Sequence, residues 1–121
     1  MRWIEICIGL GVLAVFFLLK KSGQASVGEA KSRLRNGGLL IDVRSPSEFQ
    51  SGHLPGAMNL PLDQLEIEAP RRLPDKDRPL LLHCQSGMRS DTAKRKLAGM
   101  GYRNVFNLGS YSRAAQVVRE P

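Results

Sequence analysis

The residues best suited to chemistry lie together in the stretch Cys84–Ser90, which reads Cys-Gln-Ser-Gly-Met-Arg-Ser. Three leucines before His83 predict a short buried strand, and the residues after Arg89 have a helical pattern. Cys84 therefore lies where a strand ends and a helix follows. The small, polar and cationic residues after it allow the backbone to curl with its N–H groups inward, which forms an anion cradle. In such a cradle the sulfur is favoured as a thiolate, the nucleophilic form.

The competing interpretation of Cys84 is a buried structural cysteine, the commoner role of a free cysteine. A structural cysteine needs neither Gly87 nor Arg89 just before a helix, and their presence favours the reactive role. The only other cysteine, Cys7, lies in an apolar segment, so we do not expect a disulfide between the two. We expect Cys84 to be a free, catalytic thiol.

The elements that position Cys84 come after an N-terminal segment of different character. Residues 3–19 are apolar apart from Glu5, and Lys20 and Lys21 follow directly. About 17 helical residues reach roughly 25 Å, near the lower limit for crossing a bilayer. We expect residues 1–21 to form a transmembrane anchor or an uncleaved signal-like segment, with contact to the membrane through residues 3–19. A cleaved signal peptide is the alternative interpretation.

The distribution of charged residues indicates where the domain is located and which partners it has. The formal net charge is +7, and basic residues predominate after the apolar segment. By the positive-inside rule, this predicts a single-pass membrane protein with a cytoplasmic globular domain; a periplasmic or secreted domain is the alternative. The basic charge suits a small anionic substrate or an anionic membrane surface. No nucleic acid is expected as a partner, because the charges are scattered and no nucleic-acid motif is present.

The rest of the chain divides into a short tether, residues 22–26, and one domain, residues 27–121. Helix and strand patterns alternate along this domain. The helix patterns cover 27–35, 46–51, 62–70, 92–100 and 111–118, and the strand patterns cover 39–43, 57–60, 80–82 and 102–108. The alternation indicates an α/β fold, a parallel sheet covered by helices on both faces. Ligands of such sheets gather at the carboxyl ends of the strands, where Cys84 is expected.

Three motifs occur in order along the domain: Asp42-Val43-Arg44 with Glu48 and Phe49, then Gly52–Ala57, and then Cys84–Ser90. Together they resemble the signatures of the rhodanese, or thiosulfate sulfurtransferase, family over about residues 25–110. The resemblance implies a rhodanese-like parallel five-stranded sheet with helices on both sides. The chain departs from the family after its last strand, where Gly109-Ser110-Tyr111 lacks the second glycine and the tryptophan that related domains commonly show.

The activity implied by the resemblance is sulfur transfer through a persulfide on Cys84. The implied donor is a small anion such as thiosulfate, and the implied acceptor is cyanide, a thiol or a thioredoxin-like protein. No metal or cofactor is required, since backbone N–H groups can hold the anionic sulfur. Cys84 is the implied nucleophile, and the implied substrate-binding residues are Gln85, Ser86, Gly87, Met88 and Arg89. Arg89 either binds the donor or braces the loop, and Asp42, Arg44 and His53 are interpreted as mainly structural.

Other functions are weighed against this one. The altered C-terminal segment leaves open a membrane-tethered module that carries sulfur, or binds a partner, with little turnover. A cysteine-dependent phosphatase is disfavoured because of the length of the loop. Four residues separate Cys84 from Arg89, whereas phosphatases that use a cysteine and an arginine have a longer loop between the two. A cysteine hydrolase is disfavoured too, because His83 is next to Cys84 on a strand and points to the opposite face.

Overall fold

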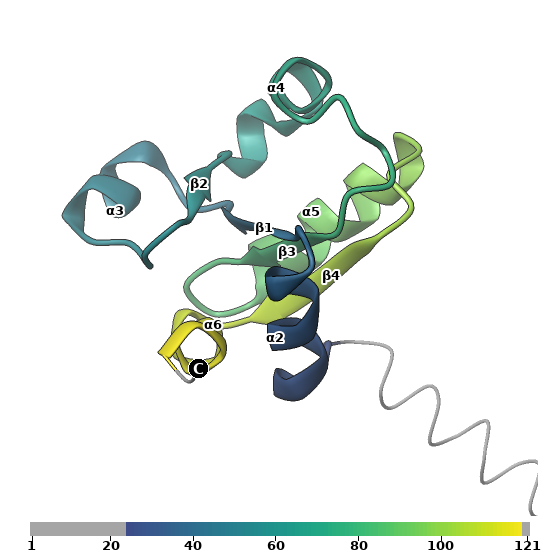
Figure 1. The fold of residues 1–121 in the computed structure, drawn as a ribbon. Coiled ribbons are helices and arrows are strands. Elements are labelled where there is room, and N and C mark those ends of the chain that lie inside the picture. The colour runs from purple at the N-terminus through teal and green to yellow at the C-terminus, as the bar shows by residue number, and fades with distance from the viewer. Residues whose placement is uncertain (1–23, 120–121) are drawn as a thin grey trace, which may run out of the picture.

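The computed structural model describes residues 24–119, which fold around one parallel sheet of four strands (Figure 1). The spatial order of the strands is β2-β1-β3-β4. The strands are β1 (Leu39–Asp42), β2 (Met58–Asn59), β3 (Leu80–His83) and β4 (Val105–Gly109). The helices are α2 (Val27–Arg35), α3 (Pro46–Ser51), the short 3-10 helix η1 (Leu62–Gln64), α4 (Leu65–Arg72), α5 (Met88–Gly99) and α6 (Tyr111–Arg119).

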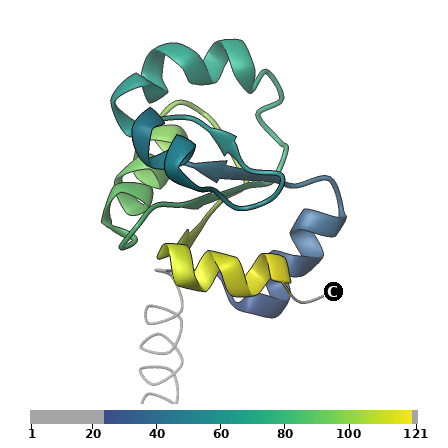
Figure 2. The ribbon, with the colours of Figure 1, turned by 90° about the vertical axis from the view of Figure 1, so that its left-hand side faces the viewer.

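Helices cover both faces of the sheet, as the alternation of elements predicts (Figure 2). Successive strand residues point to opposite faces, so the core has two halves. Ile41, Leu80 and Leu82 pack on the side of α4 and α5. Leu40 and Leu81 pack on the side of α2 and α6. The fold class expected from the sequence is confirmed in this respect.

The sheet has four strands, so the expectation of five is wrong. Among residues 24–119, the chain beside the outer edge of β4 makes a single backbone hydrogen bond there, from Ala25 N to Asn107 O at 3.2 Å. Ser26 then caps α2, its hydroxyl accepting a hydrogen bond from Glu29 N at 3.2 Å. Within the described residues, the chain thus turns into a helix without adding a fifth strand to the sheet.

Local signals set most helix boundaries. The predicted helix 27–35 is confirmed, and α3 begins as predicted with a capping box formed by Ser45 and Glu48. Helix α4 runs past Pro70, where the sequence predicted its end, to Arg72. Pro70 lacks an amide donor, but the last turn still closes with a hydrogen bond from Leu73 N to Ala69 O at 2.7 Å.

The expected N-terminal apolar helix, residues 1–21, lies outside the described residues, as do Cys7 and the first part of the tether 22–26. Between residues 24 and 119, none of the helices has both the length and the hydropathy that a bilayer span requires.

Candidate active site

The reactive candidate Cys84 lies immediately after β3, at the carboxyl end of the sheet, as predicted. Its side chain faces α5, within the core half that contains Leu82, and has no exposed surface. Its backbone N–H donates to Gly109 O at 3.2 Å, and Tyr111 N donates to Gln85 O at 3.2 Å. The end of β4 and the start of α6 therefore hold the first residues of the loop in place.

Gly87 brings a backbone donor to the sulfur. Its N–H donates to Cys84 Sγ, with nitrogen and sulfur 3.0 Å apart. Gly87 has a φ of +101°, which favours glycine, and a Cβ there would lie 3.3 Å from backbone atoms of Gly109. Both the turn and the close approach of β4 therefore require glycine at this position.

Helix α5 begins at Met88, four residues before the predicted start at Thr92. The left-handed Gly87 is the N-cap, and its carbonyl accepts from Asp91 N at 3.1 Å. The prediction was wrong because the helix begins without a side-chain cap, the usual sequence signal of a start. Arg89 consequently lies in the first helical turn, and the positive end of the helix dipole is directed at the sulfur loop.

The surroundings of Cys84 favour its thiolate. Burial alone raises the pKa of the thiol, but hydrogen bonds to the sulfur outweigh that effect. The groups that lower the pKa are the backbone and hydroxyl of Ser90 and the N–H groups of Gly87 and Ser86. Of these, the Gly87 N–H makes the direct hydrogen bond to the sulfur. The resulting pKa of Cys84 lies below its ordinary value of 9.0. Sequence reasoning correctly expected amides turned toward the sulfur.

Ser90 belongs to the Cys84–Ser90 motif, but its role was not predicted from the sequence. It is fully buried, and its hydroxyl donates to Asn107 Oδ1 at 2.7 Å. The same Asn107 oxygen accepts from Gly109 N at 2.8 Å. Ser90 thus ties the first turn of α5 to β4, beside the sulfur. An asparagine within the otherwise apolar run of β4 was the available sequence signal.

Arg89 pairs with a residue far from it in the chain. Its two terminal nitrogens donate to the two oxygens of Glu48, at 2.7 and 3.0 Å. This pair, with further hydrogen bonds from Ser45, lowers the pKa of Glu48 to about 2. Arg89 therefore braces α5 against α3, and contact with a donor stays a prediction. Glu48 could be recognised from sequence only as a helix-capping residue.

The remaining predicted binding residues differ in exposure. Gln85, Ser86 and Met88 are exposed, Met88 the most at 78%. The N–H of Ser86 helps to lower the pKa of Cys84. Arg89 also lines an open pocket of about 420 Å³ next to α5, together with Lys96 and parts of η1.

His83 lies on the opposite face of the sheet from Cys84, as its strand position predicts. Its ring meets Tyr111 edge-on, with centroids 5.6 Å apart, and its Nε2 lies 3.8 Å from Asp42. Burial lowers the pKa of His83, which favours the neutral ring. His83 is thus not placed to act as a base for the sulfur.

Asp42 and Arg44 form a buried ion pair beneath the loop, with a shortest distance of 2.7 Å. Arg44 also donates to Gly52 O at 2.7 Å and lies over the ring of Tyr111. His53 stacks on Phe49 at the surface. These contacts agree with a structural interpretation of Asp42, Arg44 and His53.

Comparison with known proteins supports this picture. The rhodanese-like domain family matches residues 26–115. The thiosulfate sulfurtransferase PspE of Escherichia coli is 39% identical over 69 residues, which cover 57% of this chain and 66% of PspE. The thiosulfate:glutathione sulfurtransferase of Saccharomyces cerevisiae is 35% identical over 78 residues, covering 55% and 56% of the two chains. The human single-domain sulfurtransferase TSTD1 superposes with a TM-score of 0.67 at 28% identity, covering 81% of this chain and 97% of TSTD1.

This chain spans about half to two thirds of the length of the first curated relatives. The matched family region nevertheless contains all four strands and the complete loop from Cys84 to Ser90. On the fold, the site and these matches together, the chain belongs to the rhodanese-like domain family.

Proposed function

We propose that this protein is a sulfurtransferase that moves a sulfane sulfur from a donor such as thiosulfate to a thiophilic acceptor, through a persulfide on Cys84. The observation that carries the proposal is the N–H of Gly87, 3.0 Å from Cys84 Sγ. This donor, together with the groups of Ser86 and Ser90 that also lower the pKa of Cys84, favours the thiolate.

The proposed reaction has two steps, loading of Cys84 with sulfur and transfer of that sulfur to the acceptor. In the first, the Cys84 thiolate attacks the outer sulfur of thiosulfate, a new S–S bond forms, and the bond to the sulfonate sulfur breaks with its electron pair to release sulfite. In the second, the acceptor attacks the terminal sulfur and Cys84 leaves as thiolate. Because the Cys84 side chain is anionic both as the resting thiolate and as the loaded persulfide, the same N–H donors stabilise both forms.

Access to the sulfur limits which molecules can react. The Cys84 side chain has no exposed surface, so side chains or backbone of the loop must shift before a donor reaches it. Gln85 and Ser86 are exposed and are the natural part to move. This favours a donor as small as thiosulfate.

A small thiol or cyanide fits the same restriction as acceptor. The name of the yeast relative, a thiosulfate:glutathione sulfurtransferase, supports a thiol. A thioredoxin-like protein is the larger alternative, and it would require a wider opening of the loop around Cys84.

The same full burial of Cys84 favours one second candidate function. A domain that opens rarely would hold its sulfur until a partner binds, and would act as a sulfur carrier or partner-binding module with little turnover. The two functions differ in turnover. An enzyme passes through many cycles with thiosulfate and cyanide, whereas a carrier takes up one sulfur atom and keeps it until its partner binds.

Turnover measured with two substrate classes tests the proposal. We expect thiosulfate and cyanide to give thiocyanate with wild type and none with Cys84→Ser, and an aryl phosphate to release no phosphate. Single loading without turnover would indicate the carrier. Phosphate release that depends on Cys84 would replace sulfur transfer with phosphatase chemistry.

We further propose that residues 1–21 anchor the domain in a membrane, with the domain cytoplasmic. The support comes from the sequence: an apolar run at 3–19, followed directly by Lys20 and Lys21. Full-length protein should then stay with membranes after alkaline carbonate extraction and retain Leu19. Release into the carbonate supernatant, or a mature chain that starts after residue 21, would contradict the anchor.

A further inference from the structure

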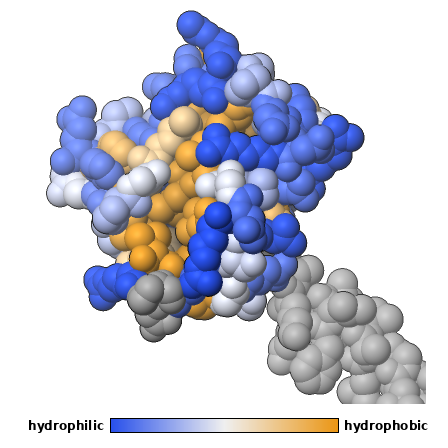
Figure 3. Space-filling model, in the orientation of Figure 1, coloured by the Kyte–Doolittle hydropathy of each residue, from blue (hydrophilic) through white to orange (hydrophobic). Residues whose placement is uncertain are grey.

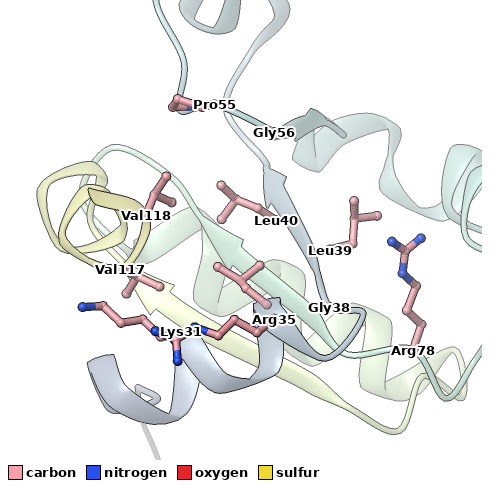
Figure 4. Close-up of a pocket in the computed structure, with 11 residues that line it drawn as sticks. Lys31, Arg35, Gly38, Leu39, Leu40, Pro55, Gly56, Arg78, Val117 and Val118 are labelled. Atoms are coloured by element: carbon pink, nitrogen blue, oxygen red, sulfur yellow. The ribbon is translucent and has the colours of Figure 1, made fainter. Parts of the chain in front are cut away.

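An open groove lies at the opposite end of the sheet from Cys84. It has a volume of about 500 Å³ and is bounded by α2, β1 and α6, with Pro55 and Gly56 on its remaining side (Figure 4). Leu39, at its edge, pairs with Leu80, the first residue of β3. Four residue-to-residue steps of about 3.3 Å each separate Leu80 from Cys84 along the strand, roughly 13 Å. The groove is thus separate from the sulfur loop.

The floor of the groove is apolar. Leu40 and Val117 lie at its base, and Leu34 and Val118 are half-buried along it. Leu39 borders it at one end, its side chain on the other face of the sheet. In the view of Figure 3 an apolar strip runs across this face of the molecule and is bordered by hydrophilic residues. An apolar strip in a hollow suits inserted side chains better than it suits a flat surface.

The rim of the groove is cationic. Lys31 and Arg35 lie one turn apart on α2, and Arg78 lies at the other end, beside Leu39 (Figure 4). None of the described residues that line the groove is acidic. Arg78 is held by a hydrogen bond from its Nε to Gly37 O at 2.9 Å, and within residues 24–119 its terminal nitrogens and those of Arg35 have no partner. They can therefore receive carboxylates at both ends of the apolar floor.

The backbone beside the groove is open as well. Strand β2 pairs with β1 only at Ile41 and Asp42. On that side, the segment from Gly38 to Leu40 has no neighbouring strand among the described residues. An unpaired strand edge is a common place for an extended peptide to add its own backbone hydrogen bonds.

We propose that this groove binds an extended acidic peptide segment of a partner protein, with apolar side chains on the floor and carboxylates at Arg35 and Arg78. A small molecule would have to bear separated negative charges on an apolar middle to match both ends. A membrane surface would meet the cations but would leave the hollow floor unfilled. The inference does not depend on the chemistry of Cys84.

A peptide-display selection on the full-length protein tests the proposal. The probe is a pool of peptides of about eight residues, long enough for a short strand, with paired Asp or Glu at both ends and Leu, Ile, Val or Phe between. We expect selected members to bind saturably in fluorescence anisotropy. A charge-reversed pool with Lys in place of the acidic residues should not bind.

The Arg35→Glu and Arg78→Glu variants should each weaken peptide binding at least about tenfold, since each places like charges together. Arg71→Glu is the matched control, because Arg71 is 75% exposed on α4, away from the groove. It should bind like wild type, and all variants should keep wild-type sulfur loading and melting temperature. Arg35→Glu keeps the test decisive if Arg78→Glu fails to fold, because the Arg35 side chain has no hydrogen bond to lose within the described residues.

Three results would overturn the proposal. One is the absence of saturable binding below about 1 mM, the limit of even weak recognition. A second is equal binding by wild type and Arg35→Glu. The third is binding to vesicles of phosphatidylglycerol, with loss in the same variants, while the peptides do not bind. That result would assign the surface to a membrane instead.

Discussion

Replacing Glu48 by glutamine should destabilise the protein by about 1 kcal/mol. The change removes the charge that pairs with Arg89 but keeps an amide oxygen to accept the hydrogen bonds from Ser45. The pKa of Glu48 falls from 4.5 to about 2 in the folded protein, chiefly through Arg89. That fall corresponds to about 3–4 kcal/mol at about 1.4 kcal/mol per pKa unit. The two side chains are 34% and 38% exposed, so solvent screening reduces the net contribution to about 1 kcal/mol.

The loss of stability in Glu48→Gln should depend on pH. A carboxyl whose folded pKa is lowered stabilises the protein above its unfolded pKa, and this stabilisation is lost as pH falls through the folded pKa. The difference between wild type and Glu48→Gln should be full above about pH 4.5 and should vanish toward pH 2. Urea unfolding at several pH values measures it.

Glu29→Gln is the control, since Glu29 also pairs with an arginine, Arg33, but at 3.3 Å and on an exposed helix face. It should change the free energy of unfolding by at most about 0.5 kcal/mol at any pH. If Glu48→Gln and Glu29→Gln behave alike, the pair of Arg89 with Glu48 does not brace the loop and the reasoning about α3 and α5 fails.

The other predictions concern the loop and the network beneath it. Ser90→Ala should raise the pKa of Cys84, so the pH profile of iodoacetamide alkylation should move to higher pH than in wild type. An unshifted profile would show that the Ser90 hydroxyl does not help to stabilise the thiolate. Gly87→Ala should cost about 1–3 kcal/mol in urea unfolding, because its φ is +101° and the new Cβ meets Gly109, and it should also slow sulfur loading; wild-type loading would mean that the Gly87 N–H is dispensable. Arg44→Leu should cost about 3–5 kcal/mol in urea unfolding by leaving Asp42 buried without its partner; a loss below about 1 kcal/mol would contradict a structural role for this ion pair.

Much of the fold could be predicted because its signals are local. Ser45 and Glu48 form their capping box within four consecutive residues, and the leucines before His83 specify a buried strand by their run alone. Helix α2 matches its prediction for the same reason. The position of Cys84 at the carboxyl end of a strand follows from these elements taken in order.

The errors arose where distant parts of the chain decide the structure. The number of strands depends on whether residues 24–26 pair with β4 for one hydrogen bond or several, which a three-residue pattern does not encode. The start of α5 depends on the Gly87 turn, and that turn is fixed by contact with Gly109. Neither contact leaves a periodic signal in the sequence.

The site was predictable in its backbone and less so in its side chains. The inward amides followed from a glycine-containing loop before a helix. The partner of Arg89 could not be predicted, because Glu48 lies 41 residues away in the chain. The role of Glu48 in capping its own helix already explained why a glutamate is present there. The placement of Ser90 depends on Asn107, which a different strand contributes.

The most direct test of the central claim is the intact mass of the protein after incubation with thiosulfate. Wild type should gain about 32 Da, one sulfur atom on the Cys84 thiolate, and lose it again on addition of cyanide. Cys84→Ser should gain nothing, and Ser112→Ala, an exposed serine on α6, should gain as much as wild type. An equal gain in wild type and Cys84→Ser, or no gain in wild type, would contradict a sulfur-carrying thiolate at this site.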